Sequence, residues 1–200
     1  MAKSRELLAL AGKIRGRWDT GRGTLFHFLQ NGNALEIEKV RWFTHHLNRA
    51  GVRPFALAIN RLSNGLIYIV IGVLFWLAFG ATSAVLAAAG ALAFGHVVYP
   101  VIKRHYRRRR PFQFDQSVPS LLPPLDDYSF PSGHMMSCVA VAIPLCVAVP
   151  AMVPGAIALL LMIGWARLVA GHHYPSDLAA GGMLGAAVAI PIVAAQIGLG

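Results

Sequence analysis

The longest uncharged stretch of the chain is the feature that most restricts its fold. From Gly65 to Ile102, 38 residues contain no Asp, Glu, Lys or Arg. One membrane-spanning helix needs roughly 20 apolar residues, so this stretch predicts two spans joined by a tight turn near Gly80. Hydrophobic residues make up 56% of the chain and charged residues 13%, whereas soluble domains carry about 25% charged residues. We therefore expect an integral membrane protein.

Two further uncharged stretches complete the predicted architecture, an all-α helical bundle in the membrane. Met135 to Ala166 predicts two helices broken near Pro150, and Leu178 to Gly200 predicts the last span. The total is about five transmembrane helices. In the last span, Gly181 and Gly185 form a small-xxx-small pair, which favours close packing against a neighbouring helix.

The N-terminal part of the chain is basic and its apolar pattern is interrupted. Apolar residues recur at helical spacing between Leu7 and Trp18, and again from Val40 to Leu47, which predicts amphipathic helices lying at the membrane surface. Arginines interrupt the apolar pattern from Trp42 to Leu62, so we interpret that segment as a surface or half-inserted helix and not as a span. We expect residues 1–62 to form an interfacial segment and residues 63–200 to form the transmembrane catalytic domain.

The strong positive charge of the chain is explained by the predicted membrane topology. The net charge is +10, but a chain lying mostly in lipid is not expected to bind nucleic acid. Anionic headgroups and a phosphorylated substrate explain the charge better. With five spans, all 18 Lys and Arg residues fall on one side, which the positive-inside rule makes cytoplasmic. A sixth span near residues 42–62 would reverse this orientation.

Three short segments concentrate the chemically active residues, and each adjoins an uncharged stretch. The first runs from Lys103 to Pro111 and holds six cations, the second is Pro131 to His134, and the third runs from Arg167 to Asp177. Charge is costly at the centre of a membrane, so it gathers at the rim. Cations and hydroxyl donors suit the oxygens of a phosphate group, and histidines suit nucleophilic and acid–base work on it.

These segments match a known family in order and spacing. The sequence resembles the type 2 phosphatidic acid phosphatase (PAP2) superfamily, in its integral-membrane lipid phosphatase branch. The family pattern is a Lys, six residues and Arg-Pro; then Pro-Ser-Gly-His; then Ser-Arg, five residues, His, three residues and Asp. Here the pattern reads Lys103 to Pro111, Pro131 to His134, and Arg167 to Asp177. The departure is Ala166, which stands where the family has serine and removes one hydroxyl beside Arg167.

The chemistry of the side chains and the resemblance imply the same roles. His173 is the candidate nucleophile, which would form a phosphohistidine, and Asp177 would hold its imidazole in the right tautomer. His134 is the candidate general acid and base. The expected phosphate-binding residues, which supply charge and donors to the phosphoryl oxygens, are Lys103, Arg110, Ser132, Gly133 and Arg167.

The residues beside the motifs are expected to have other roles. We interpret the remaining arginines of the first segment, Arg104 and Arg107 to Arg109, as headgroup or solvent contacts. Asp126 and Asp127 read as solvated rim residues, and His105 and His172 as bystanders. His96 faces either helix packing or a cavity.

The function that these expectations imply is hydrolysis of a lipid phosphate. The candidate substrates are phosphatidate, phosphatidylglycerophosphate, and polyprenyl phosphates or pyrophosphates, including a polyprenyl-linked phosphosugar. We expect no metal and no other cofactor, because cations take the metal's role. The expected location is a bacterial inner (plasma) membrane. Two alternatives stay open, which are a lipid phosphotransferase using the same phosphohistidine and a non-catalytic protein that binds lipid phosphates.

The orientation predicts the accessibility of Ser117, which lies between the first and second segments. In a chain in which Cys138 and Cys146 are replaced, Ser117→Cys should resist an impermeant thiol reagent applied to intact cells and should react after the cells are opened. Labelling from outside intact cells would place the three segments on the opposite side.

Overall fold

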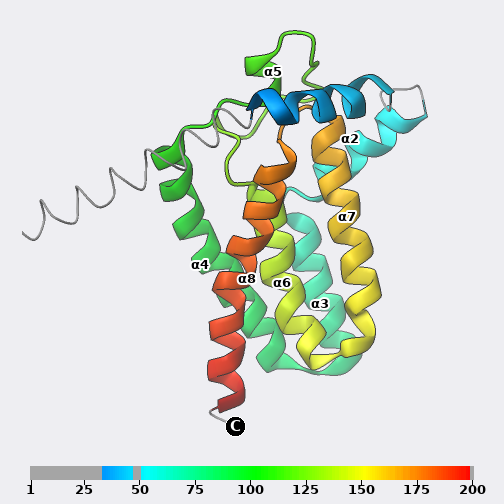
Figure 1. Cartoon of the computed structure of the whole chain (residues 1–200). Coiled ribbons are helices and arrows are strands. Elements are labelled where there is room, and N and C mark those ends of the chain that lie inside the picture. Colours follow the sequence, from blue (N-terminus) through cyan, green and yellow to red (C-terminus); the bar gives the residue numbers. More distant parts are fainter. Residues whose placement is uncertain (1–32, 47–50, 199–200) are drawn as a thin grey trace, which may run out of the picture.

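The fold is a bundle of long helices in which successive helices run in opposite directions, as the sequence predicts. A computed structural model describes residues 33–46 and 51–198, and Figure 1 shows the helices running up and down beside one another. No strand occurs in the described part of the chain. The bundle consists of α3 (Leu66–Phe79), α4 (Thr82–Tyr106), α6 (Gly133–Ala148), α7 (Val153–Val169) and α8 (Pro175–Gly198).

The breaks between these helices lie where the sequence places them. Gly80 ends α3 in the left-handed conformation, with φ of 62°, which glycine adopts without steric cost. A short 3₁₀ helix, η1 (Pro150–Met152), separates α6 from α7. Because proline lacks an N–H and fixes φ, it ends one helix and begins the next at low cost. Both predicted turns are confirmed.

Shorter helices cover one end of the bundle. Residues 33–46 are helical, and this helix lies across the end of the bundle together with α2 (Val52–Leu62) and α5 (Pro111–Phe114) (Figure 1). Val40 is fully buried in this helix. The predicted amphipathic helix from Leu7 to Trp18 lies outside the described residues.

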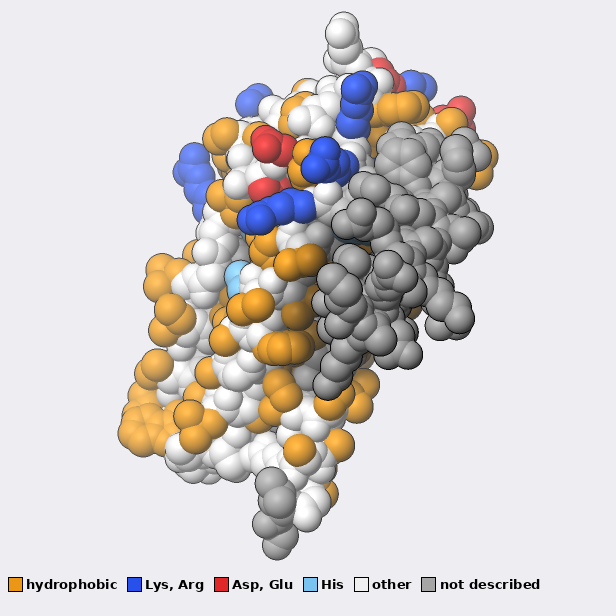
Figure 2. All heavy atoms as spheres, turned by 90° about the vertical axis from the view of Figure 1, so that its left-hand side faces the viewer, with side chains coloured by type: hydrophobic (Ala, Val, Ile, Leu, Met, Phe, Trp, Pro, Cys, Tyr) orange, Lys and Arg blue, Asp and Glu red, His pale blue; other side chains and the backbone are white. Residues whose placement is uncertain are grey.

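The outer surface of the bundle is apolar, as an integral membrane protein requires. Within the described residues, α4 with the segment to Phe114, the stretch from Pro150 to Val169, and α8 are each long and apolar enough to cross a membrane. The α2–α3 pair is a further candidate, although it is bent by 69°. Helix α6 is apolar but shorter, so the count of five spans stays a prediction. Figure 2 shows Lys and Arg gathered toward one end of the visible face and hydrophobic side chains over the rest.

The contact between α6 and α8 is close because two glycines of α8 face α6. A Cβ at Gly181 would collide with the backbone oxygen of Ser132, and one at Gly185 would lie 2.5 Å from the backbone oxygen of Met136. Protein interiors are close-packed, so even one methyl group is felt. The predicted small-xxx-small face is confirmed, and it brings the start of α8 against the start of α6.

Gly185→Ala should destabilise the bundle by about 1–3 kcal/mol, because its methyl group would meet backbone and not a flexible side chain. Gly182→Ala on the same helix is the matched control, since its Cβ would lie at an ordinary 3.7 Å from Val139. Thermal unfolding of both variants in detergent tests this. Equal stability of the two variants would contradict the close packing described.

Candidate active site

The three segments singled out in the sequence meet at the end of the bundle covered by the shorter helices. Lys103 lies in the last turn of α4 and Arg110 directly precedes α5. The start of α6, the end of α7 and the loop before α8 contribute the rest. A hollow of about 420 Å³ is lined by six of the predicted residues, which are Lys103, Arg110, Gly133, His134, Arg167 and His173.

Two of the predicted phosphate-binding cations are held by one carboxylate. Lys103 Nζ donates to both oxygens of Asp126, at 2.7 and 2.6 Å, and Arg110 Nη2 donates to Oδ1 at 2.6 Å. Burial by itself raises the pKa of Asp126, but the two cations outweigh it and bring that pKa below its ordinary value. Asp126 is therefore an anion that already engages the donors expected to bind phosphate.

Arg167 and His134 also line the hollow and contact each other. Arg167 Nη2 lies 2.6 Å from His134 Nδ1 and 2.8 Å from Nε2. Two asparagines from α2 and the turn after it fix this pair. Asn60 Oδ1 accepts from Arg167, Asn60 Nδ2 donates to the Ala166 backbone oxygen at 3.0 Å, and Asn64 Oδ1 accepts from His134 at 2.8 Å.

His173 is buried and sits beside Asp177. The residue is 1% exposed, and Nδ1 lies 3.6 Å from Asp177 Oδ2, just beyond hydrogen-bonding distance. Burial, and then the nearby cations Arg110 and Arg167, lower the pKa of His173 well below its ordinary value. The neutral imidazole keeps a lone pair for attack on phosphorus, and its second ring nitrogen lies on the side away from Asp177.

The Ser132–Gly133 pair begins α6 within the cluster. Ser132 is fully buried and its backbone N–H donates to the backbone oxygen of Asp177 at 2.9 Å. Its Oγ and the Nε of Arg167 are buried donors with no partner in the described part of the protein. Buried polar groups without partners are costly, which makes both atoms candidate donors to a bound oxyanion. Glycine at 133 leaves room for the Tyr99 ring, which lies 3.3 Å from where a Cβ would be.

The structure thus brings the eight predicted site residues into one cluster, and it also corrects several neighbouring predictions. Arg108 is not a solvent contact: it is 1% exposed and pairs with Asp177 at 2.7 Å. Asp126 is only partly exposed, and its carboxylate pairs with Lys103 and Arg110, whereas the sequence predicts solvation alone. His172 is buried, and its backbone oxygen accepts from Arg110 at 2.8 Å. His96 lines the hollow.

The structure, and not a signal in the sequence, identifies Arg108. Helix α4 ends at Tyr106, Arg107 adopts the left-handed conformation with φ of 48°, and exposed and buried residues alternate from Arg107 to Arg110. Once Arg110 is assigned to the site, Arg108 is the residue that points the same way. No signal in the sequence separates Asp126 from its neighbour Asp127 either, because both lie in an irregular loop.

No metal-type cluster of three or more His, Cys, Asp or Glu occurs among residues 33–46 and 51–198. The charge of the site is supplied by the side chains described above.

Comparison with known families assigns the chain to a class. The family model described as the PAP2 superfamily matches residues 84–198, which is more than half of the chain and includes all three segments. The chain belongs to the PAP2 superfamily, and the resemblance found in the sequence is confirmed.

Curated relatives and solved structures agree with this assignment. The decaprenylphosphoryl-5-phosphoribose phosphatase of Mycobacterium tuberculosis (strain ATCC 25618 / H37Rv) is 38% identical over 105 residues, covering 50% of this chain and 55% of the relative. Its counterpart in Mycolicibacterium smegmatis is 41% identical over 99 residues, covering 47% and 51%. The chain therefore spans about half the length of these relatives.

Two crystal structures share the fold at low sequence identity. Aquifex aeolicus LpxE superposes with a TM-score of 0.67 at 22% identity, covering 80% of this chain and 94% of that one. A PAP2 type phosphatidylglycerolphosphate phosphatase from Bacillus subtilis gives 0.66 at 18% identity, covering 90% and 96%. The described helices therefore have the arrangement of membrane PAP2 proteins.

Asp126→Asn should tighten the binding of orthovanadate by roughly tenfold, because it removes the negative charge that competes for Lys103 and Arg110. Asp127→Asn, an exposed neighbour, is the matched control and should leave binding unchanged. Calorimetric titration of the purified protein measures both dissociation constants. Weaker binding by Asp126→Asn than by the control would show that Asp126 organises the cations and does not compete with the anion.

Proposed function

We propose that this protein is a membrane lipid phosphatase that hydrolyses a phosphomonoester through a phosphohistidine intermediate. The observation that carries the proposal is one hollow lined by His134, His173 and three cations, Lys103, Arg110 and Arg167. A nucleophile, an acid–base group and charge for the phosphoryl oxygens are the parts that phosphoryl transfer needs.

The first half-reaction uses both histidines. The ring nitrogen of His173 that faces away from Asp177 attacks phosphorus, so that a P–N bond forms while the P–O bond to the lipid breaks. His134 gives its proton to the leaving oxygen. Asp177 stabilises the positive charge that develops on the His173 ring, and the 3.6 Å separation of Nδ1 and Oδ2 requires only a small closure for a hydrogen bond.

The second half-reaction returns the enzyme to its starting state. His134, now lacking the proton, takes one from water, and the water oxygen attacks phosphorus. The P–N bond breaks, inorganic phosphate leaves and His173 is neutral again. Lys103, Arg110 and Arg167 stabilise the charge on the phosphoryl oxygens in both steps, so turnover is expected without an added metal.

The substrate class follows from similarity and from the membrane setting. The relatives named above are decaprenylphosphoryl-5-phosphoribose phosphatases, which favours a polyprenyl-linked phosphosugar among the candidate lipids. The hollow fits a lipid phosphate because apolar residues of α3 and α4, including Ile69, Ala89, Leu92 and Ala93, line it beside the cations.

The location proposed is a bacterial plasma membrane, with the site on the cytoplasmic face. Its support is the gathering of Lys and Arg at the site end of the bundle (Figure 2) together with the positive-inside rule. Residues 1–62 form the interfacial segment in this proposal, and residues 63–200 form the catalytic domain.

His173→Ala should lower turnover of a polyprenyl-linked phosphosugar by at least roughly a thousandfold, because no other group supplies the nucleophile. His45→Ala, an exposed position on the helix 33–46, is the control and should keep full activity. Phosphate release from a panel of lipid phosphates, run with and without EDTA, measures the effect. Near-normal turnover by His173→Ala would remove His173 as the nucleophile.

The same assay separates the alternatives. Transfer of phosphate to an added lipid alcohol, with little free phosphate, would indicate a phosphotransferase. Binding of the lipids with no turnover of any of them would indicate a non-catalytic phosphate-binding protein.

A further inference from the structure

We propose that Arg108 is a positioning residue for Asp177, and that Glu36 on the helix 33–46 holds Arg108 in place. This inference rests on the proposed function, because it assigns a role in the reaction of the same site. Arg108 does not line the hollow, so it would act through Asp177 and not on the phosphate.

Each of the three guanidinium nitrogens of Arg108 donates at least one hydrogen bond. Nη1 donates to Asp177 Oδ1 at 2.7 Å and to Ser176 Oγ at 2.6 Å. Nη2 donates to Glu36 Oε2 at 2.8 Å, and Nε donates to Asn33 Oδ1 at 2.8 Å. The guanidinium also lies 4.0 Å from the centre of the Tyr174 ring.

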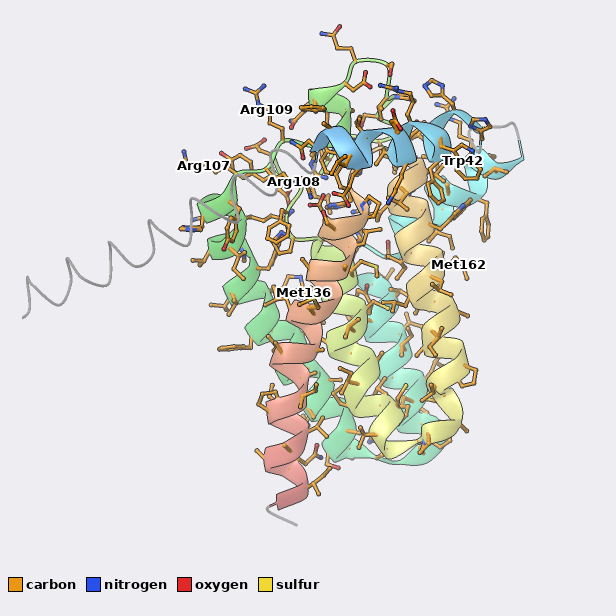
Figure 3. All side chains as sticks on the ribbon, in the orientation of Figure 1. Trp42, Arg107, Arg108, Arg109, Met136 and Met162 are labelled. Carbon is orange, nitrogen blue, oxygen red and sulfur yellow. The ribbon has the colours of Figure 1, made fainter. Side chains whose placement is uncertain are left out.

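The position of this side chain differs from those of its neighbours. In Figure 3 Arg107 and Arg109 project away from the bundle, whereas Arg108 lies between the helix 33–46 and the start of α8. A guanidinium that is 1% exposed is stable only with paired charge and satisfied donors. Glu36 and Asp177 supply that charge.

The two carboxylate oxygens of Asp177 have different partners, and Arg108 binds only one of them. Oδ1 accepts from Arg108, while Oδ2 accepts the Tyr174 backbone N–H at 2.8 Å and faces His173 Nδ1. Asp177 is itself fully buried. Without Arg108 the carboxylate would lose its closest cation and would be free to turn away from His173, so that the imidazole would lose its orientation and its negative neighbour.

Glu36 connects this pair to a part of the chain outside the family match. Glu36 Oε1 accepts the Ser176 backbone N–H at 2.9 Å and Oε2 accepts the Ser176 hydroxyl at 2.6 Å. The same carboxylate therefore fixes both Arg108 and the first turn of α8, where Asp177 lies. The helix 33–46 precedes residues 84–198, which the family model matches, so part of the site of this chain comes from a segment outside that match.

The expected kinetic signature is a fall in kcat with little change in KM, because the phosphate-binding cations are untouched. Arg108→Met should lower kcat by roughly a hundredfold, and Arg108→Lys, which keeps the charge but not the fork of donors, should recover part of it. Glu36→Gln should lower kcat by roughly tenfold. The controls are Arg109→Met and Glu38→Gln, both exposed, and they should match the unaltered protein.

Combining the changes tests the order of contacts. If Glu36 acts through Arg108, the variant that combines Arg108→Met with Glu36→Gln should have the same kcat as Arg108→Met alone, since the effects of coupled residues are not additive. A double variant slowed by the product of the single effects would overturn the chain of contacts. Equal kcat values for Arg108→Met and Arg109→Met would also overturn the inference, as would a raised KM with an unchanged kcat in Arg108→Met.

A second readout does not depend on turnover. Nitrogen NMR of protein labelled with ¹⁵N-histidine in detergent micelles reports the ring nitrogens of His173, assigned with His173→Ala. Arg108→Met and Glu36→Gln should shift the His173 signals, while orthovanadate binding stays within about twofold. Unshifted signals in both variants would overturn the inference. If the unaltered protein turned over no lipid phosphate, the proposed function would fail, and the NMR result would still decide the role of Arg108.

Discussion

Four cationic side chains are buried at one end of this bundle, and the rest of the site depends on how their charge is balanced. Lys103, Arg108, Arg110 and Arg167 are each 5% exposed or less. Asp126 pairs with two of them and Asp177 with a third, but the partners of Arg167 among the described residues, Asn60 and His134, include no carboxylate. Since buried like charges repel strongly, this end of the molecule favours a further anion.

The packing of the bundle brings these charged side chains together, because it places the ends of several helices side by side. Gly181 and Gly185 let α8 approach α6 so closely that Ser132 donates to the backbone of Asp177. Asn60 of α2 accepts from Arg167 and donates to the backbone of Ala166, so an amide from outside the three segments contacts the position where the family has a serine. Packing in the membrane and chemistry at its rim are therefore parts of one arrangement.

The sequence predicts the helices and the eight site residues, because each leaves a local signal. Uncharged stretches mark the spans, Gly80 and Pro150 mark the turns, and the motif spacing marks the site. Asp126 and Arg108 leave no such signal, since their roles depend on which side chains they meet across the fold. A loop carboxylate looks solvated until Lys103 and Arg110 are placed beside it, and Arg108 is one of several consecutive basic residues until the structure shows which of them is buried.

The central claim is that the three segments form one phosphoryl-transfer site with His173 at its reacting point. A crystal structure of the protein with orthovanadate tests it most directly. The account predicts vanadium bonded to His173 at the nitrogen away from Asp177, its oxygens contacting Lys103, Arg110 and Arg167, and Asp126 displaced from both cations. Vanadate bound elsewhere, or His134 and His173 on separate sides of the ion-binding hollow with no shared anion, would contradict it.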